Sequence, residues 1–204
     1  GAFSAANPGV DVRFNFAASS ELMTQIREGA PADVFASADL TTMAELIDDG
    51  GHAGEPIVFT TNRAQIIVER GNPEGITGLE DLADDDLVVI SCAPQVPCGR
   101  YGQQILDNAD VTVTFDSLEE NVRAVVSKVT LGEADAGIVY VTDVIGAGDA
   151  ADGVEIPADV NVVAEYPIAV TDDAPNPAAA QAFVDFVTSA GGKAILESFG
   201  FVAP

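Results

Sequence analysis

The sequence has few basic residues and no tryptophan. Lys and Arg total 8 against 33 Asp and Glu among 204 residues, which gives a formal net charge of −25. Nucleic acids and anionic lipid surfaces are bound by basic patches, so this balance argues against both as partners. No apolar run has the length of a membrane span. Gly1 does not open a basic segment followed by an apolar one, so we expect that any targeting segment has been removed.

Histidine and cysteine are scarce as well, which argues against a site built from these ligands. His52 is the single histidine; it cannot build a histidine-rich zinc site, and we expect a surface residue. The aspartates at 84–86 lack the alternating spacing of a calcium loop. GAGDAA at 146–151 fits a loose dinucleotide-binding fingerprint, but VTDVI separates it from the preceding strand, which favours a surface turn.

Hydrophobic periodicity predicts alternating strands and helices. Strands are expected at 10–16, 32–37, 64–69, 87–91, 111–115, 135–141 and 162–170, from period-two alternation or short apolar runs. Helices are expected at 19–29, 39–50, 98–109, 119–132 and 178–192, several with serine starts and glycine stops. This rhythm is typical of an α/β protein with mainly parallel sheets. GDAADG at 148–153 is expected to be a turn.

Both cysteines lie in the stretch CAPQVPCGRYG, where Cys92 and Cys98 flank two prolines. A metal site would need more soft ligands than two. At a helix N-terminus Cys98 would have a depressed pKa, which keeps a nucleophilic role open, although no histidine is near in sequence to act as base. A short proline-containing loop closed by the two cysteines favours a disulfide and an oxidising compartment. Its main effect would be to hold rigid the turn before the next helix.

Several helix starts could bind an anion, because their first amides point outward and the helix dipole adds positive charge. One is the start at Cys98 and Gly99, the second is Ala18-Ser19-Ser20, and the third is Glu120-Asn121-Val122. Each of these also fits an ordinary helix cap.

Longer blocks resemble the periplasmic molybdate-binding proteins of ABC importers. The clearest are FAASSELMTQIREGAPADVFASAD (16–39) and ENVRAVVSKVTLGEADAGIVYVTD (120–143), joined by GNPEGITGLEDLA, VPCGRYG, YPIAV and the terminal GFVAP in family order. The resemblance implies the type II periplasmic binding protein fold, with two α/β lobes and an oxyanion in the cleft between them. Lobe 1 would comprise 1–62 and 168–204, and lobe 2 would comprise 63–167.

The resemblance also implies the residues that bind the anion. In the ASS element a serine hydroxyl and amide hold the ligand, which points to Ser19 with Ser20 beside it. The V-P-x-G element offers the amide of Cys98, the N-V-R element that of Val122, and the tyrosine closing GIVY offers its hydroxyl, here Tyr140. Cys98 would then be a staple whose own N–H binds the ligand, while its sulfur does no chemistry.

The function implied by the resemblance is capture of molybdate or tungstate for the membrane permease of an ABC importer. We expect no enzyme activity, no cofactor, no direct metal–protein bond, a monomer, and a periplasmic or extracytoplasmic location with a possible lipid anchor. The alternatives are another oxyanion such as sulfate, or a cysteine-dependent hydrolase using Cys98. Family members carry a first strand and a serine loop before the segment matching FAASS. This sequence starts at GAFSAANPGVDV, so we expect one anion donor and one strand of lobe 1 to be lacking.

Overall fold

The chain divides into two compact units. Its computed structural model describes residues 1–48 and 53–204. Unit 1 consists of Gly1–Thr60, Glu165–Ser198 and Val202–Pro204, and unit 2 of Thr61–Ala164 and Phe199–Phe201. Strands β2 (Ile57–Glu69) and β7 (Val163–Val170) each begin in one unit and end in the other. The expectations for His52 and for the glycines that should end the helix at 39–50 fall outside the described residues.

Unit 1 is built mainly from helices around a short antiparallel strand pair. Its elements besides parts of β2 and β7 are α1 (Ala2–Ala6), α2 (Ser19–Arg27), β1 (Val34–Ala36), α3 (Leu40–Asp48), α7 (Pro177–Thr188) and α8 (Ala190–Glu197). Val34 of β1 lies opposite Val170 of β7. Apolar spacing on α2 turns Met23 toward Phe35 and Met43, and all three are buried in one cluster. The α2 start, with its two serines, is therefore fixed by packing on one helix face.

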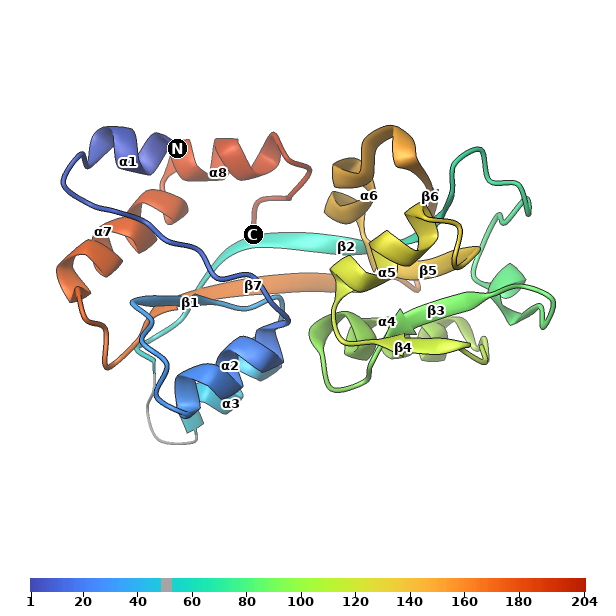
Figure 1. Ribbon diagram of the computed structural model, residues 1–204, viewed down its shortest axis with the longest axis horizontal. Helices are drawn as coiled ribbons and strands as arrows, with labels where there is room; N and C mark the ends of the chain where they lie inside the picture. The colour runs from blue at the N-terminus through green and yellow to red at the C-terminus, as the bar shows by residue number, and fades with distance from the viewer. Residues whose placement is uncertain (49–52) are drawn as a thin grey trace. The chain divides into compact units, whose positions relative to one another are not determined.

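Unit 2 holds a mixed sheet, shown with its helices in Figure 1. Its strands besides β2 are β3 (Val89–Cys92), β4 (Ser117–Glu119), β5 (Ala136–Tyr140) and β6 (Ala151–Glu155), and its helical segments are η1 (Glu80–Ala83), α4 (Pro97–Ala109), α5 (Val122–Thr130), α6 (Val141–Ala147) and η2 (Gly148–Ala150). Strand β3 is parallel to both β4 and β5, whereas β2 runs antiparallel to β5 and β6. The expectation of mainly parallel pairing was therefore wrong, because β2 enters unit 2 against the direction of β5.

Helices α4 and α5 pack on opposite faces of this sheet. A Cβ on Gly137 of β5 would lie 2.6 Å from Val125 of α5, while the next residue, Ile138, faces Gly102 of α4. Successive strand residues point to opposite faces, so the two helices must lie on different sides. The α4 side contains an apolar cluster in which Ile66, Ile105 and Ile138 are almost fully buried.

Two expected strands do not form. Residues 10–16 have no regular structure, and Phe14 and Phe16 are 64% and 74% exposed. Their alternation lacks a neighbouring strand, and a strand is stable only when its main-chain groups are paired. Residues 111–115 do turn Val111, Val113 and Phe115 toward the core. The pairing with β3, however, begins only at Ser117.

Two further expectations, both in the C-terminal half, differ from the structure. The helix expected at 178–192 is two helices, because Ser189 ends α7 and its side chain caps α8 by accepting the Gly192 N–H at 3.1 Å. The segment 148–153 is a short 3-10 turn followed by the edge strand β6, whose register with β2 pairs Gly153 with Ile67. The sequence did not predict this strand, because it contains glycine and aspartate, which are depleted in strands.

Candidate functional site

The carboxyl ends of three neighbouring strands meet at one edge of the unit 2 sheet. Strands β4, β3 and β5 are adjacent and parallel, with Cys92 opposite Glu119 and Ile90 opposite Gly137. Each strand is followed directly by a helix: α4 after β3, α5 after β4 and α6 after β5. Ligands of α/β sheets bind at this carboxyl edge, where helix starts present free amides. Cys98, Val122 and Tyr140 all lie there.

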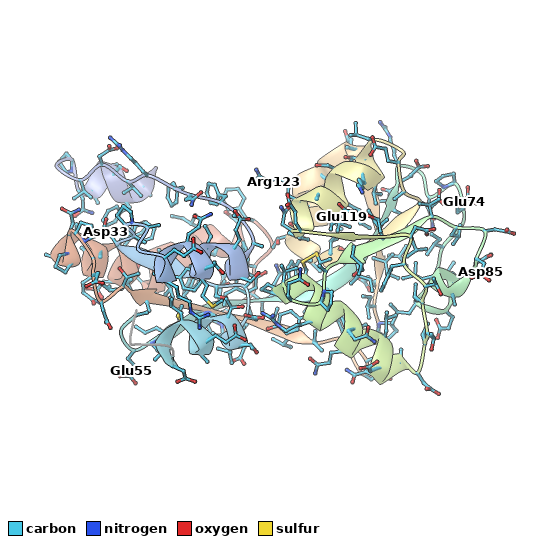
Figure 2. The ribbon with its side chains drawn as sticks, turned by 60° about the horizontal axis from the view of Figure 1, so that its bottom comes forward. Asp33, Glu55, Glu74, Asp85, Glu119 and Arg123 are labelled. Atoms are coloured by element: carbon cyan, nitrogen blue, oxygen red, sulfur yellow. A yellow bond between two sulfur atoms is a disulfide. The ribbon has the colours of Figure 1, made fainter. Side chains whose placement is uncertain are left out.

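The loop after β3 is closed by a disulfide, as the sequence predicted. Cys92 and Cys98 are bonded with a Cα–Cα distance of 5.7 Å, and both side chains are buried. Figure 2 shows the pair as a yellow bond. Inside the loop, the Val96 N–H donates to the Ala93 carbonyl at 3.1 Å. A disulfide-bonded sulfur has no thiolate, so the structure removes Cys98 as the nucleophile of a hydrolase.

The start of α4 packs closely against this loop. Val96 is the N-cap and Pro97 the first helical residue, which makes Cys98 the second. Its N–H therefore has no partner within the helix and points out of its first turn. Gly99 is required here, since a Cβ would lie 2.1 Å from the Ala93 oxygen and 2.7 Å from that of Cys92. The disulfide and this close approach together fix the direction of the Cys98 N–H.

The start of α5 is held by a side-chain cap. Asn121 is the extended N-cap residue, and its Oδ1 accepts the N–H of Ala124 at 3.0 Å. Val122 is the first helical residue, so its own N–H is left without an intrahelical partner. The carbonyl of Glu119 accepts the Ala93 N–H at 2.8 Å, which joins the disulfide loop to the end of β4. The Cys98 and Val122 amides are therefore carried by one hydrogen-bonded framework.

Tyr140 lies at the junction between β5 and α6, where it is both the last strand residue and the N-cap. It is 5% exposed, and its hydroxyl is buried. Its ring lies edge-on to that of Tyr101 of α4, with 6.4 Å between the ring centroids. Its N–H donates to Asp143 Oδ2 at 3.0 Å. The aromatic contact places the ring on the α4 side of the sheet.

Asp143 is an unusual acid at this edge. Burial raises the pKa of Asp143 to about 6, although the Tyr140 N–H and the positive charge of Arg123 both act in the opposite direction. Asp143 therefore loses its proton close to neutral pH, whereas an exposed aspartate is fully ionised there.

Glu119 places a second carboxylate at the end of β4, close to the start of α5, and that charge is compensated. Lys128 Nζ lies 2.6 Å from its Oε1, and the Ser117 hydroxyl donates to the same oxygen at 2.6 Å. Burial alone would raise the pKa of Glu119, but these hydrogen bonds outweigh it, so the pKa lies below its usual value. Figure 2 labels Glu119 and, from the first turn of α5, Arg123.

The serines expected to bind the anion lie in unit 1, at the start of α2. Ser19 is the first helical residue and is 7% exposed, while Ser20 is half-buried. Ser19 Oγ accepts the N–H of Ala38 at 3.0 Å. A hydroxyl that accepts in this way keeps its proton available to donate to a ligand oxygen. The Ser20 carbonyl accepts the Thr24 hydroxyl within the helix.

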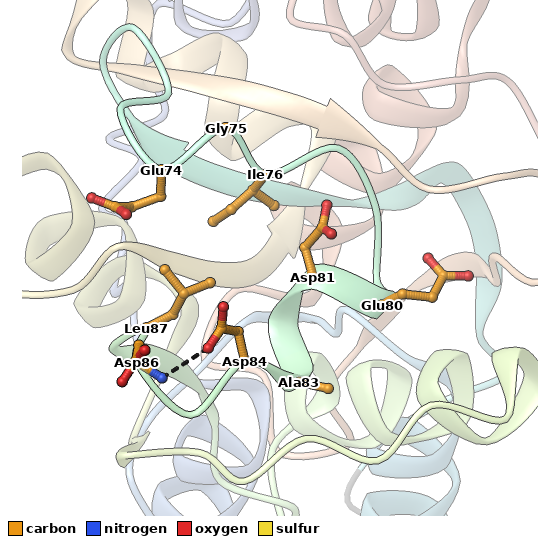
Figure 3. Close-up of a pocket in the computed structure, with 9 residues that line it drawn as sticks. All are labelled: Glu74, Gly75, Ile76, Glu80, Asp81, Ala83, Asp84, Asp86 and Leu87. Atoms are coloured by element: carbon orange, nitrogen blue, oxygen red, sulfur yellow. Dashed lines mark hydrogen bonds between the residues drawn. The ribbon is translucent and has the colours of Figure 1, made fainter.

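A hollow of about 580 Å³ lies elsewhere in unit 2, around η1, and Figure 3 shows its lining. Five of its lining residues are carboxylates, so the hollow repels an anion. Among the described residues, no group of three His, Cys, Asp or Glu is placed to hold a metal ion. Asp81, one of the five, instead accepts hydrogen bonds from the N–H and the hydroxyl of Thr77, and these lower its pKa. The lining residues are Glu74, Gly75, Ile76, Glu80, Asp81, Ala83, Asp84, Asp86 and Leu87.

The sequence alone did not reveal those parts of this site that depend on contacts between residues far apart in the chain. It assigned no role in ligand binding to Asp143, to Arg123 or to the pair of Glu119 with Lys128. The spacing Tyr140-x-x-Asp143 resembles a capping box and could have indicated the bond between them. The need for glycine at 99 follows from the approach of a carbonyl that no local pattern reveals.

Comparison with known proteins gives a consistent family. The bacterial extracellular solute-binding protein family matches residues 1–202. The molybdate-binding protein ModA of Mycobacterium bovis is 44% identical over 202 residues, which span 99% of this chain and 77% of that protein. In the described residues, no helix is both long enough and apolar enough to span a membrane.

Solved structures of related fold cover nearly the whole chain. The substrate-binding domain of a putative molybdenum ABC transporter from Clostridium difficile is 26% identical, with a TM-score of 0.72 and coverage of 100% and 90% of the two chains. The sulfate-binding protein SubI from Mycobacterium tuberculosis is 20% identical, with a TM-score of 0.85 and coverage of 98% and 79%. The fold is that of the type II periplasmic binding proteins, as the resemblance implied.

Proposed function

Because this chain belongs to the bacterial extracellular solute-binding proteins, we propose that it captures molybdate for the membrane permease of an ABC importer. Tungstate, an anion of the same charge and shape, is a near-equal ligand. The similarity to a molybdate-binding protein across 99% of this chain supports the ligand. The chain acts by binding and release, as an extracytoplasmic monomer, and catalyses no reaction.

The observation that carries this proposal is the set of neutral donors at one sheet edge of unit 2. The amides of Cys98 and Val122 and the hydroxyl of Tyr140 come from three adjacent strand–helix junctions. Fixed dipoles can solvate a dianion without reorganising, even in a protein with a net charge of −25. Lacking a direct ion pair, such a site also releases its anion readily.

The donor chemistry also supports selection among oxyanions. A site made of donors disfavours a protonated anion such as hydrogen phosphate, whose O–H would find no acceptor. Molybdate and tungstate are fully deprotonated at neutral pH, and so is the smaller sulfate. Discrimination against sulfate therefore rests on the spacing of the donors, which the disulfide and Gly99 hold rigid.

We further propose that Ser19 and Ser20, in unit 1, are oxyanion donors. The resemblance of the ASS element supports this assignment, as does the position of Ser19 at a helix start with its proton available. The proposed lobes correspond to residues 1–62 with 168–204, and 63–167. Retention at the cell surface by a lipid anchor stays part of this proposal.

Titration calorimetry with sodium molybdate tests the function. We expect one anion per chain with tight binding, similar binding of tungstate, at least tenfold weaker binding of sulfate, and none of phosphate. Equal or tighter binding of sulfate would make this a sulfate-binding protein. No heat and no thermal stabilisation with any of the four anions would reject the proposal.

A further inference from the structure

Asp143 is a carboxylate in direct contact with Tyr140, a residue of the proposed site. It occupies the third position of α6, and its Oδ2 accepts the N–H of Tyr140 at 3.0 Å. The acid is half-buried, and Arg123 on α5 attracts its charge. The other charged residues on elements packed against α6 are Lys128, which pairs with Glu119, and Asp149, Asp152 and Glu155, which are exposed.

The hydrogen bond from Tyr140 to Asp143 controls the strand–helix junction. Tyr140 has φ −100 and ψ 156, an extended conformation, while the next residue is helical. Its N–H donates to the Asp143 carboxylate, which fixes the direction of that N–H. The ring leaves the main chain at this point and reaches Tyr101. The place of the hydroxyl therefore depends on the acceptor at Asp143.

We propose that Asp143 is a positioning residue of the anion site, which acts through Tyr140, and that its charge makes anion affinity depend on pH. This inference rests on the proposed function. An acceptor oxygen at position 143 holds the Tyr140 hydroxyl toward the carboxyl edge. The negative charge on that same oxygen repels a dianion bound nearby, and Arg123 offsets part of the repulsion.

The sign of the pH effect follows from the state of the acid. Burial raises the pKa of Asp143 to about 6, so part of the population is protonated just below neutral pH. A dianion at the edge favours the neutral acid further, because like charges raise a carboxyl pKa. Anion binding is therefore coupled to proton uptake, and molybdate affinity should rise as the pH falls from 8 to 6.

Three variants of the full chain separate position from charge. Asp143→Ala removes both acceptor and charge, Asp143→Asn keeps an acceptor without the charge, and Asp149→Asn makes the same charge change at an exposed site on η2. Each is titrated with sodium molybdate by calorimetry at pH 6, 7 and 8. Circular dichroism checks that each variant is folded.

We expect Asp143→Ala to bind molybdate about tenfold more weakly than the parent, as expected for one misplaced donor to a charged oxygen. Asp143→Asn should bind within about threefold of the parent at pH 6, where the parent acid is partly neutral, and its affinity should be flat with pH. Asp149→Asn should follow the parent throughout. The parent should gain affinity several-fold between pH 8 and pH 6.

Two results overturn the inference while leaving the proposed function intact. One is parent-like binding by Asp143→Ala, and the other is binding by Asp143→Asn that is as weak as that of Asp143→Ala. If Asp143→Ala does not fold, the pH profile decides, and an Asp143→Asn profile identical to that of the parent overturns the inference. Failure of the parent itself to bind molybdate would instead reject the proposed function.

Discussion

Gly99→Ala is the substitution whose consequence the structure specifies most closely. The new Cβ would lie 2.1 Å from the Ala93 oxygen, 2.6 Å from its carbonyl carbon and 2.7 Å from the Cys92 oxygen. All three are main-chain atoms in a loop closed by the disulfide, so none can rotate away. To reach ordinary contact, the loop and the start of α4 must separate by about 1 Å.

That separation should lower both stability and anion affinity. Overpacking of this kind destabilises a protein by about 1–3 kcal/mol. The movement also displaces the Cys98 N–H, and losing one hydrogen bond to a charged oxygen weakens binding about tenfold or more. Urea denaturation measures the first effect, and molybdate calorimetry the second.

Gly102→Ala is the matched control for this experiment. It lies one turn further along α4, where a Cβ would meet its nearest neighbour, Ser91 Oγ, at 3.5 Å. Alanine in a helix interior is favoured over glycine by about 0.5–1 kcal/mol, so this variant should be as stable as the parent or more so, with unchanged affinity. If Gly99→Ala behaves like Gly102→Ala in both assays, the account of the disulfide loop is wrong.

Three further predictions concern the hydroxyl, the disulfide and the buried acid. Tyr140→Phe keeps the ring but removes a donor, so molybdate affinity should fall about 10- to 150-fold in calorimetry; unchanged affinity would leave Tyr140 a packing residue. Replacing Cys92 and Cys98 by serine should lower the free energy of unfolding by about 2–3 kcal/mol in urea and weaken binding, and parent-like values in both would contradict the staple. Burial raises the pKa of Asp143 from 3.8 to about 6, so as the pH falls the folded chain takes up this proton at a higher pH than the unfolded chain does. The free energy of unfolding should therefore rise as pH falls from 7 toward 4. Asp143→Asn should lack about 1–3 kcal/mol of that rise in denaturation curves, and a curve parallel to the parent's would refute the shift.

The elements that sequence predicted well are those whose signals are local. The helix start at Ser19, the apolar stripe around Val125 and Val129, and the buried strand before Tyr140 all appear as expected. Each depends on residues within a few positions of one another. The Cys92–Cys98 bond belongs to this class, because a short loop brings the two cysteines together without help from distant contacts.

The failures share a dependence on partners that lie far away in sequence. Residues 10–16 alternate like a strand but pair with no strand of the described residues, and β6 pairs with β2 despite its turn-like composition. The close approach of Gly99 to Ala93 and the attraction between Arg123 and Asp143 are likewise set by tertiary packing. The roles of Ser19, Ser20, Cys98, Val122 and Tyr140 as ligand donors stay predictions.

Diffraction at the molybdenum absorption edge, from crystals of this chain grown with molybdate, would locate the bound anion. We expect one molybdenum per chain, with oxygens about 2.7–3.1 Å from the amide nitrogens of Cys98 and Val122 and from the Tyr140 hydroxyl. The protein should contact only the oxygens of the anion. A molybdenum peak away from the carboxyl edge of β3, β4 and β5, for example in the acidic hollow around Asp81, would contradict this expectation.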